Sequence, residues 1–228
     1  AKEFDIKILM LLLFGGFFVV ASSNIYNQII EKDLDALMIR TRNRPIPTNR
    51  ISVNEALILA ILFTIIGLTL LYIIYPIVAL LAAVSIFLYA SVYTPLKLIT
   101  PLSVFVGAIP GALPFMLGWV AATGEVGIEA VILFLMQFFW QFPHFWSIGW
   151  MQNKDYKNAG FKMLPTGKKD KSTTSQIIFY SIWAVLMSII PAFNLTGDLF
   201  LSVYGLIFVL IIGLVLIYYA VNLFNNSS

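Results

Sequence analysis

Seven apolar runs, each close to the length that crosses a bilayer, constrain this chain more than any other feature. A transmembrane helix needs about 20 consecutive, mostly apolar residues. In lipid the backbone must satisfy its own hydrogen bonds, and the runs lack the alternation typical of a barrel strand. The sequence therefore predicts an all-α, polytopic bundle with spans near 6–23, 55–74, 76–94, 102–122, 128–150, 176–196 and 199–221.

The composition is that of an integral membrane protein. Of the 228 residues, 60% are hydrophobic and 11% are charged, whereas soluble domains have about 25% charged residues. The absence of cysteine excludes disulfides, thiolate metal sites and cysteine nucleophiles. The first run has no small-residue cleavage site, so it is not a signal peptide. We expect residues 1–228 to form a single transmembrane domain that belongs to a longer protein.

The basic residues are gathered on one side of the predicted bundle. When the spans alternate, segments 24–54, 95–101 and 151–175 share a side and hold all but Lys2 and Lys7 of the 14 Lys and Arg residues. The positive-inside rule makes this side cytoplasmic. Because topology already explains the basic residues, no nucleic-acid partner is expected.

A polar segment directly follows the first span. At about 100° per residue, Asn27, Glu31 and Asp35 lie on one helical face, while Asp33 turns away. Oxygen ligands one turn apart suit Mg²⁺, which is usually held by one or two carboxylates together with substrate phosphates. The alternative interpretation is a polar helix end that reaches into water.

Cationic side chains follow these acids. Arg40 and Arg44 are one turn apart, and their planar guanidinium groups match phosphate oxygens. The arginines either neutralise the acids or bind, with them, a Mg²⁺-bound diphosphate. Lys97 is the only charge in its short loop. It is either a topology marker or a ligand of the same anion.

The fifth span carries a second polar stripe. Gln137, Gln141, His144 and Asp155 are predicted to share a face, allowing for distortion at Pro143. A lone histidine in an apolar helix is either a structural hydrogen-bonding residue or a functional one, since ionisable groups are costly in a membrane. In the fourth span, the doubled Gly-Ala-x-Pro of 107–114 favours either a kinked packing helix or the wall of a cavity.

These motifs resemble the UbiA-type intramembrane prenyltransferases, and within them the branch that farnesylates protoheme IX. The resemblance covers essentially the whole chain, and its motifs occur in the order of that branch. They are Asn27-Gln28-x-x-Glu31-x-x-x-Asp35, Met38-x-Arg40-Thr41-x-Asn43-Arg44-Pro45, Tyr93 to Lys97, Gly107 to Pro114, Trp140 to Phe145 and Asp155 to Pro165.

The resemblance implies an architecture and a reaction. It implies nine spans, of which seven are present here and the first and last are missing, around a central cavity open on the cytoplasmic side. The implied reaction is Mg²⁺-dependent transfer of a farnesyl group from farnesyl diphosphate to haem b in a bacterial-type inner membrane. Addition of water would then give haem O. A haem A synthase or an oxidase assembly protein is the implied protein partner.

The resemblance also assigns roles to individual residues. The implied metal ligands are Asn27, Glu31, Asp35 and Asp155, the diphosphate ligands are Arg40, Arg44, Lys97 and Lys162, and the catalytic residues are His144 and Tyr93.

The pattern departs from the family at two points. Glu31 stands where many relatives have Asp, and the second acidic motif is reduced to Asp155, with Met151 and Ser147 before it. Two rival functions stay open: a UbiA-type transferase with another aromatic acceptor, and a membrane ion transporter.

Overall fold

The computed structural model describes residues 5–227, and these residues form helices, turns and loops without a strand. The long helices are α1 (Ile6–Ile30), α3 (Val53–Ile74), α4 (Pro76–Phe87), α6 (Ser103–Thr123), α7 (Ile128–Met151), α9 (Lys171–Ile189) and α10 (Val203–Asn225). Helix α4 continues through the π-helix η1 (Leu88–Tyr93) into α5 (Thr94–Ile99), and α9 continues into the 3₁₀ helix η2 (Ile190–Phe193). Two short helices, α2 (Lys32–Asp35) and α8 (Asn153–Asn158), lie in the long loops.

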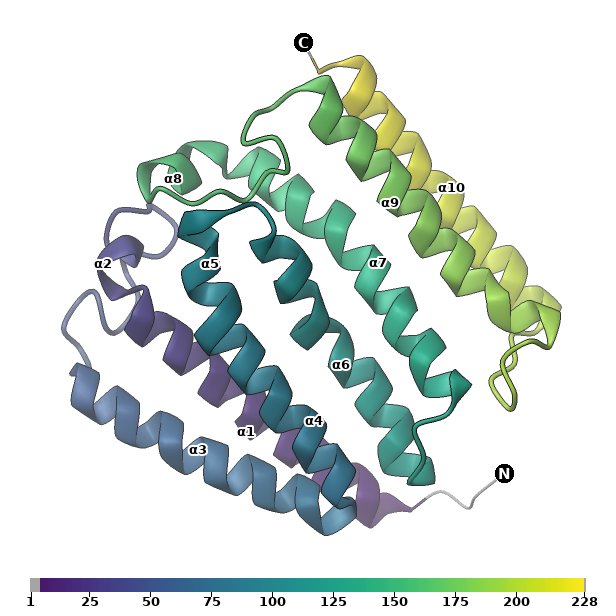
Figure 1. Ribbon diagram of the computed structural model, residues 1–228, viewed down its shortest axis with the longest axis horizontal. Helices are drawn as coiled ribbons and strands as arrows, with labels where there is room; N and C mark the ends of the chain where they lie inside the picture. The colour runs from purple at the N-terminus through teal and green to yellow at the C-terminus, as the bar shows by residue number, and fades with distance from the viewer. Residues whose placement is uncertain (1–4, 228) are drawn as a thin grey trace.

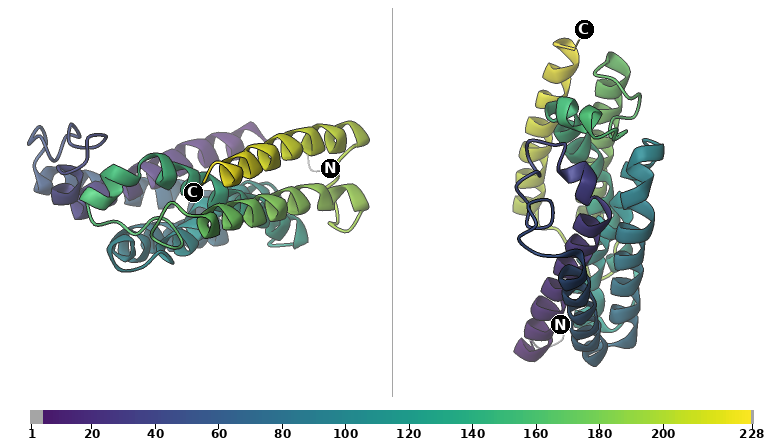
Figure 2. Two further views of the ribbon diagram at one scale, coloured as in Figure 1. Left: turned by 90° about the horizontal axis from the view of Figure 1, so that it is seen from above. Right: turned by 90° about the vertical axis from the view of Figure 1, so that its left-hand side faces the viewer.

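Seven of these helical segments are long and apolar enough to cross a membrane. The predicted all-helical bundle with seven spans is therefore confirmed, and the chain is an integral membrane protein. Figure 1 shows α2, α5 and α8 together at one end of the bundle. Figure 2 shows α1 and α10 on the same side of the layer that contains α4 and α6.

Several helices extend beyond the predicted spans. Hydropathy marks only the apolar part of a helix, so its polar ends were not included. Helix α1 continues to Ile30, and α9 begins at Lys171, where Asp170 accepts a hydrogen bond from the backbone of Thr173 at 2.8 Å. That capping bond lowers the pKa of the Asp170 carboxyl. The segment predicted as a loop at 95–101 is mostly helix α5.

Small residues bring the helices close together around the site. A methyl group added to Gly15 of α1 would lie 2.8 Å from the side chain of Leu71 in α3. On α6, a methyl group added to Gly107 would lie 2.6 Å from the Tyr93 ring of η1. In lipid the hydrophobic effect does not drive helices together. Close van der Waals packing at small residues supplies the attraction between them instead.

Candidate active site

The π-helix η1 aligns two tyrosines toward the interior of the bundle. The wider turn of a π-helix is rare and often occurs at functional sites. The rings of Tyr89 and Tyr93 lie 5.4 Å apart, and Tyr93 is 7% exposed. Gly107 leaves the space that the Tyr93 ring occupies. Tyr93 is thus fixed between α6 and the cavity described below.

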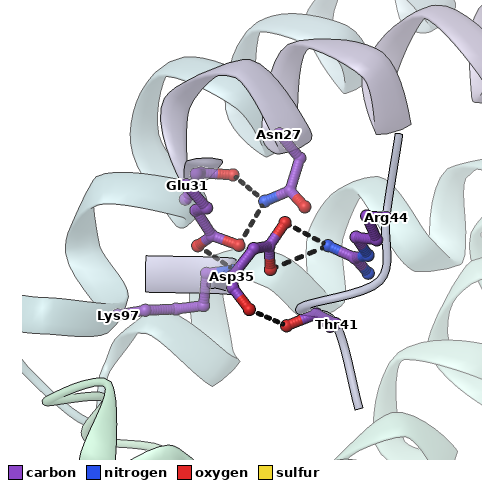
Figure 3. A network of polar contacts seen from close by, with 7 residues as sticks. Asn27, Glu31, Asp35, Thr41, Arg44 and Lys97 are labelled. Carbon is purple, nitrogen blue, oxygen red and sulfur yellow. Dashed lines mark hydrogen bonds and ion pairs between the residues drawn. The ribbon is translucent and has the colours of Figure 1, made fainter. Parts of the chain in front are cut away.

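The predicted acidic face is present, but it is not one continuous helix. Helix α1 ends at Ile30, and Glu31 stands between α1 and α2. The amide Nδ2 of Asn27 donates to Oε2 of Glu31 at 2.9 Å and to Oγ1 of Thr94 at 3.1 Å (Figure 3). Glu31 also forms a buried ion pair with Lys97. This break brings the carboxylate of Glu31 against α5.

Asp35 is fully buried and bound to an arginine. One nitrogen of Arg44 donates to both carboxylate oxygens, at 2.8 and 3.0 Å. The hydroxyl of Thr41 donates to the backbone carbonyl of Asp35 at 2.9 Å, which closes the loop between them (Figure 3). The arginine and the acid therefore neutralise each other, as one of the two interpretations of the sequence proposed.

A polar cavity of about 220 Å³ lies at this end of the bundle. It is lined by seven of the predicted site residues, namely Asn27, Glu31, Asp35, Arg40, Arg44, Tyr93 and Lys97. One small volume is thus lined by carboxylate, amide, guanidinium and ammonium groups. Some of these groups are up to 70 residues apart in the sequence.

Asp155 lies beside this cavity rather than in its wall. It is buried in α8, and its Oδ2 accepts the backbone N–H of Arg40 at 3.3 Å. The neighbouring Tyr156 does line the cavity. Burial raises the pKa of the Tyr156 phenol, against the opposing charge of Arg40. The phenol therefore stays protonated near neutral pH and can donate a hydrogen bond to an anion.

Besides Asp155, two further predicted residues do not line the polar cavity. Lys162 is directed to the carbonyl of Ile99, to which its Nζ donates at 3.0 Å. His144 is exposed, and its ring stacks on Trp140 with centroids 4.6 Å apart. The predicted polar face of the fifth span is wrong, because Gln141 is buried and donates to the carbonyl of Ala108 at 3.0 Å.

A larger, apolar cavity of about 460 Å³ adjoins the polar one. It runs between α1, α4, α6 and α7, and it shares Tyr89, Tyr93 and Phe145 with the polar cavity. The sequence reasoning did not single out Tyr89, Tyr156 or Phe145 as site residues. The position of Tyr89 one turn before Tyr93 was the available signal for the first of them.

A substitution at Gly107 tests whether the placement of Tyr93 matters. We expect Gly107→Ala to displace the Tyr93 ring, because the new methyl group would lie 2.6 Å from it. Overpacking of this kind costs about 1–3 kcal/mol of stability, and any activity that depends on the placement of this ring should fall with it. Gly118→Ala is the control, since nothing lies within 4 Å of a methyl group there. Equal activities of the two variants would show that the position of the Tyr93 ring is unimportant.

A helical membrane bundle in which a charged cavity and an apolar cavity share three lining residues suits an intramembrane prenyltransferase. The chain belongs to the UbiA prenyltransferase family, whose model matches residues 1–228. It is 58% identical to the protoheme IX farnesyltransferase of Flavobacterium psychrophilum over 99% of the chain and 76% of that relative. It is 55% identical to the protoheme IX farnesyltransferase of Christiangramia forsetii over 100% of the chain and 76% of that relative.

Solved structures share the fold. A digeranylgeranylglyceryl phosphate synthase structure superposes with a TM-score of 0.79 and 26% identity. The superposition covers 98% of the present chain and 77% of the synthase chain. A UbiA homologue from Archaeoglobus fulgidus, bound to DMAPP and Mg²⁺, gives a TM-score of 0.71 at 18% identity. The superposition covers 98% of the present chain and 76% of the homologue's chain. The second likeness extends to the fold alone.

Proposed function

We propose that this prenyltransferase transfers a farnesyl group from farnesyl diphosphate to a vinyl group of haem b, with addition of water, to give haem O. The observation that carries the proposal is that the polar and apolar cavities are neighbours and share Tyr89, Tyr93 and Phe145 in their linings. A charged compartment joined to an apolar one suits a donor with a diphosphate head and an isoprenoid tail. The names of the relatives support the farnesyl donor and the haem acceptor.

The diphosphate is assigned to the polar cavity. Arg40, Arg44 and Lys97 line it and can neutralise charge on the departing diphosphate. Because Arg44 binds Asp35 and Lys97 binds Glu31, these cations must be shared with the anion or released to it. Lys162 would join them only after leaving the carbonyl of Ile99.

The donor set fits Mg²⁺, although not as a cage made by the protein alone. Asn27, Glu31 and Asp35 offer amide and carboxylate oxygens to the polar cavity, which are hard ligands of the kind Mg²⁺ prefers. Among residues 5–227, no three His, Cys, Asp or Glu side chains are grouped as a metal site. Asp155 would contribute from its position beside the cavity. When bound, the metal would stabilise the leaving diphosphate.

The tyrosines are placed to stabilise the allylic cation. When the C–O bond to diphosphate breaks, the diphosphate keeps the electron pair and the farnesyl carbon becomes positive. The face of Tyr93 already accommodates a cation, since Nζ of Lys97 lies 4.8 Å from its centroid. Tyr93 is therefore assigned as the catalytic residue that shields the farnesyl cation until the vinyl group attacks it.

The acceptor is assigned to the outer face of α7 beside Phe145. His144 and Trp140 form an exposed aromatic surface there, and the His144 ring lies 5.5 Å from that of Phe145. After the vinyl group attacks the farnesyl cation, water adds to the resulting haem cation and loses a proton. His144 would position haem at this surface. A UbiA-type transferase with another aromatic acceptor is the second candidate, because the surface is aromatic without being specific for a porphyrin.

The orientation follows from charge. The polar cavity is lined by Arg40, Arg44 and Lys97 of the basic segments. The positive-inside rule assigns these segments to the cytoplasm, and we assign the membrane as a bacterial-type inner membrane. Polar groups gathered at one end, instead of along the whole depth of the bundle, disfavour an ion transporter. A haem A synthase or oxidase assembly protein would receive the product.

The function is tested by incubating the protein in nanodiscs with Mg²⁺, farnesyl diphosphate and haem b, and then measuring the mass of the extracted haem. The proposal predicts haem that has gained one farnesyl group and the elements of water. Unchanged haem, together with prenylation of an added aromatic quinone precursor, would favour the second candidate.

The role of His144 is tested separately. We expect His144→Phe to weaken haem binding about tenfold, because loss of a polar or iron-binding group costs on the order of 1–2 kcal/mol, while farnesyl diphosphate binding stays unchanged. Haem titration followed in the Soret band measures the first quantity, and calorimetry measures the second. An unchanged Soret titration would remove His144 from the acceptor site.

A further inference from the structure

Thr94 binds a predicted metal ligand from behind the polar cavity. It is 2% exposed, and it is not among the residues that line the cavity. Its Oγ1 accepts a hydrogen bond at 3.1 Å from Nδ2 of Asn27, which does line the cavity. Thr94 therefore contacts a residue of the site without facing the cavity itself.

The hydroxyl of Thr94 can only accept a hydrogen bond from Asn27. A threonine hydroxyl has one proton, and Thr94 donates it to the carbonyl of Tyr89 at 2.8 Å. A carbonyl oxygen cannot donate, so this direction is fixed and Oγ1 is left to accept. The group that faces Thr94 must therefore be the NH₂ of the Asn27 amide and not its oxygen.

Glu31 imposes the same orientation on this amide from the other side. Nδ2 of Asn27 also donates to Oε2 of Glu31 at 2.9 Å, and a carboxylate can only accept. Both N–H bonds of the amide are thus used, and its oxygen is directed away from Glu31, toward the side of Asp35 (Figure 3). An amide oxygen is a hard ligand of the kind that binds a divalent cation.

The π-helix sets the position of the Thr94 hydroxyl. In an α-helix, a threonine hydroxyl usually bonds the carbonyl three or four residues earlier. Thr94 instead bonds the carbonyl of Tyr89, five residues earlier, and its backbone N–H is bonded to the same carbonyl. The wider turn of η1, which brings the rings of Tyr89 and Tyr93 together, therefore also directs Thr94 toward Asn27.

We propose that Thr94 is a positioning residue, which holds the Asn27 amide with its oxygen toward the polar cavity and so raises the affinity of the site for a divalent cation. Glu31 cannot replace it, because a Glu31 carboxylate that turns to the cation must share or lose its bond to Asn27. The inference rests on the proposed function, in that it takes a divalent cation as an occupant of this cavity.

The experiment measures Mn²⁺ affinity by electron paramagnetic resonance on the protein in nanodiscs, with farnesyl diphosphate present and no haem. Mn²⁺ takes the same kinds of oxygen ligand as Mg²⁺. Thr94→Val removes the hydroxyl at nearly constant volume, whereas Thr94→Ser retains it. Calorimetry then measures farnesyl diphosphate binding to each variant, once with Mg²⁺ and once with EDTA.

Thr64→Val is the matched control. The Thr64 hydroxyl also links two helices, since it donates to the carbonyl of Ala60 in α3 at 2.8 Å and meets the hydroxyl of Tyr26 in α1 at 3.4 Å. It lies outside the lining of the polar cavity. Its loss removes a comparable interhelical contact without touching a predicted metal ligand.

We expect Thr94→Val to bind Mn²⁺ about tenfold more weakly than the wild type or worse, the usual effect of removing a hydrogen-bond partner of a metal ligand. Thr94→Ser and Thr64→Val should stay within about twofold of the wild type. With EDTA, farnesyl diphosphate affinity should stay within about twofold in every variant, because the orientation of a metal ligand has no effect without the metal.

Three results would overturn the inference. One is wild-type Mn²⁺ affinity in Thr94→Val, and another is an equal loss in Thr94→Ser. The third is an equal loss of farnesyl diphosphate affinity with and without the metal, which would make Thr94 a support of the fold alone. If Thr94→Val does not fold, Thr94→Ala is judged by the same criteria.

Failure of the proposed function gives a different result. A wild type that does not bind farnesyl diphosphate would contradict the proposed function itself. A wild type that binds farnesyl diphosphate but no Mn²⁺ would contradict the metal in it, and the role of Thr94 would be refuted with the metal. No haem is added, so an error in the acceptor would leave these results unaffected.

Discussion

Asp35→Asn is expected to abolish prenyl transfer, with a loss of about 10²–10³-fold in turnover, the usual effect of removing one electrostatic contributor to a transition state. Asp35 is fully buried, holds Arg44 through both carboxylate oxygens and faces the polar cavity. The amide keeps the shape of the side chain but removes the charge that would bind Mg²⁺. It also leaves Arg44 without its partner.

The control for this variant is Asp33→Asn on the same short helix. Asp33 is exposed, so its loss should leave turnover within about twofold, as is usual for surface substitutions. Both variants are assayed for haem O formation after thermal unfolding has confirmed that they fold. Substantial turnover by Asp35→Asn would exclude Asp35 from the metal and diphosphate site.

Lys97→Met is expected to have the largest effect on stability. Lys97 and Glu31 form an ion pair whose side chains are 9% and 5% exposed. Removing one partner of such a pair leaves an uncompensated buried charge and costs about 3–5 kcal/mol. The thermal unfolding temperature of the variant should fall accordingly.

The double variant Glu31→Gln with Lys97→Met separates stability from chemistry. It leaves no unpaired charge, so most of the lost stability should return. Turnover should stay low, because both a predicted metal ligand and a predicted diphosphate ligand are gone. A double variant that recovers turnover along with stability would show that the ion pair is only structural.

The helical architecture followed directly from the sequence because hydrophobic runs of bilayer length have few alternative structures. The seven spans were predictable, and so was the meeting of Asn27, Glu31 and Asp35 at one cavity. Helical periodicity placed these three on one face, and they line one cavity although the helix breaks at Glu31.

The rest of the site depends on tertiary contacts that periodicity does not encode. The π-helix that aligns Tyr89 with Tyr93 has no clear sequence signal, although Gly107 across from it makes room for the ring. Packing of α7 against α6 buries Gln141, which donates to the carbonyl of Ala108, while His144 is exposed, so the two do not share a face as predicted. The direction of Lys162 depends on its bond to Ile99, which lies 63 residues away.

The central claim is that the polar and apolar cavities form one prenyl diphosphate site. It is tested most directly by photocrosslinking with a farnesyl diphosphate analogue that carries a diazirine at the end of its tail, followed by mass spectrometric mapping. The account predicts adducts near Leu12 to Phe17 of α1 or Leu117 of α6, and their loss when excess farnesyl diphosphate is present. Adducts confined to α9 and α10, or labelling that farnesyl diphosphate does not reduce, would contradict it.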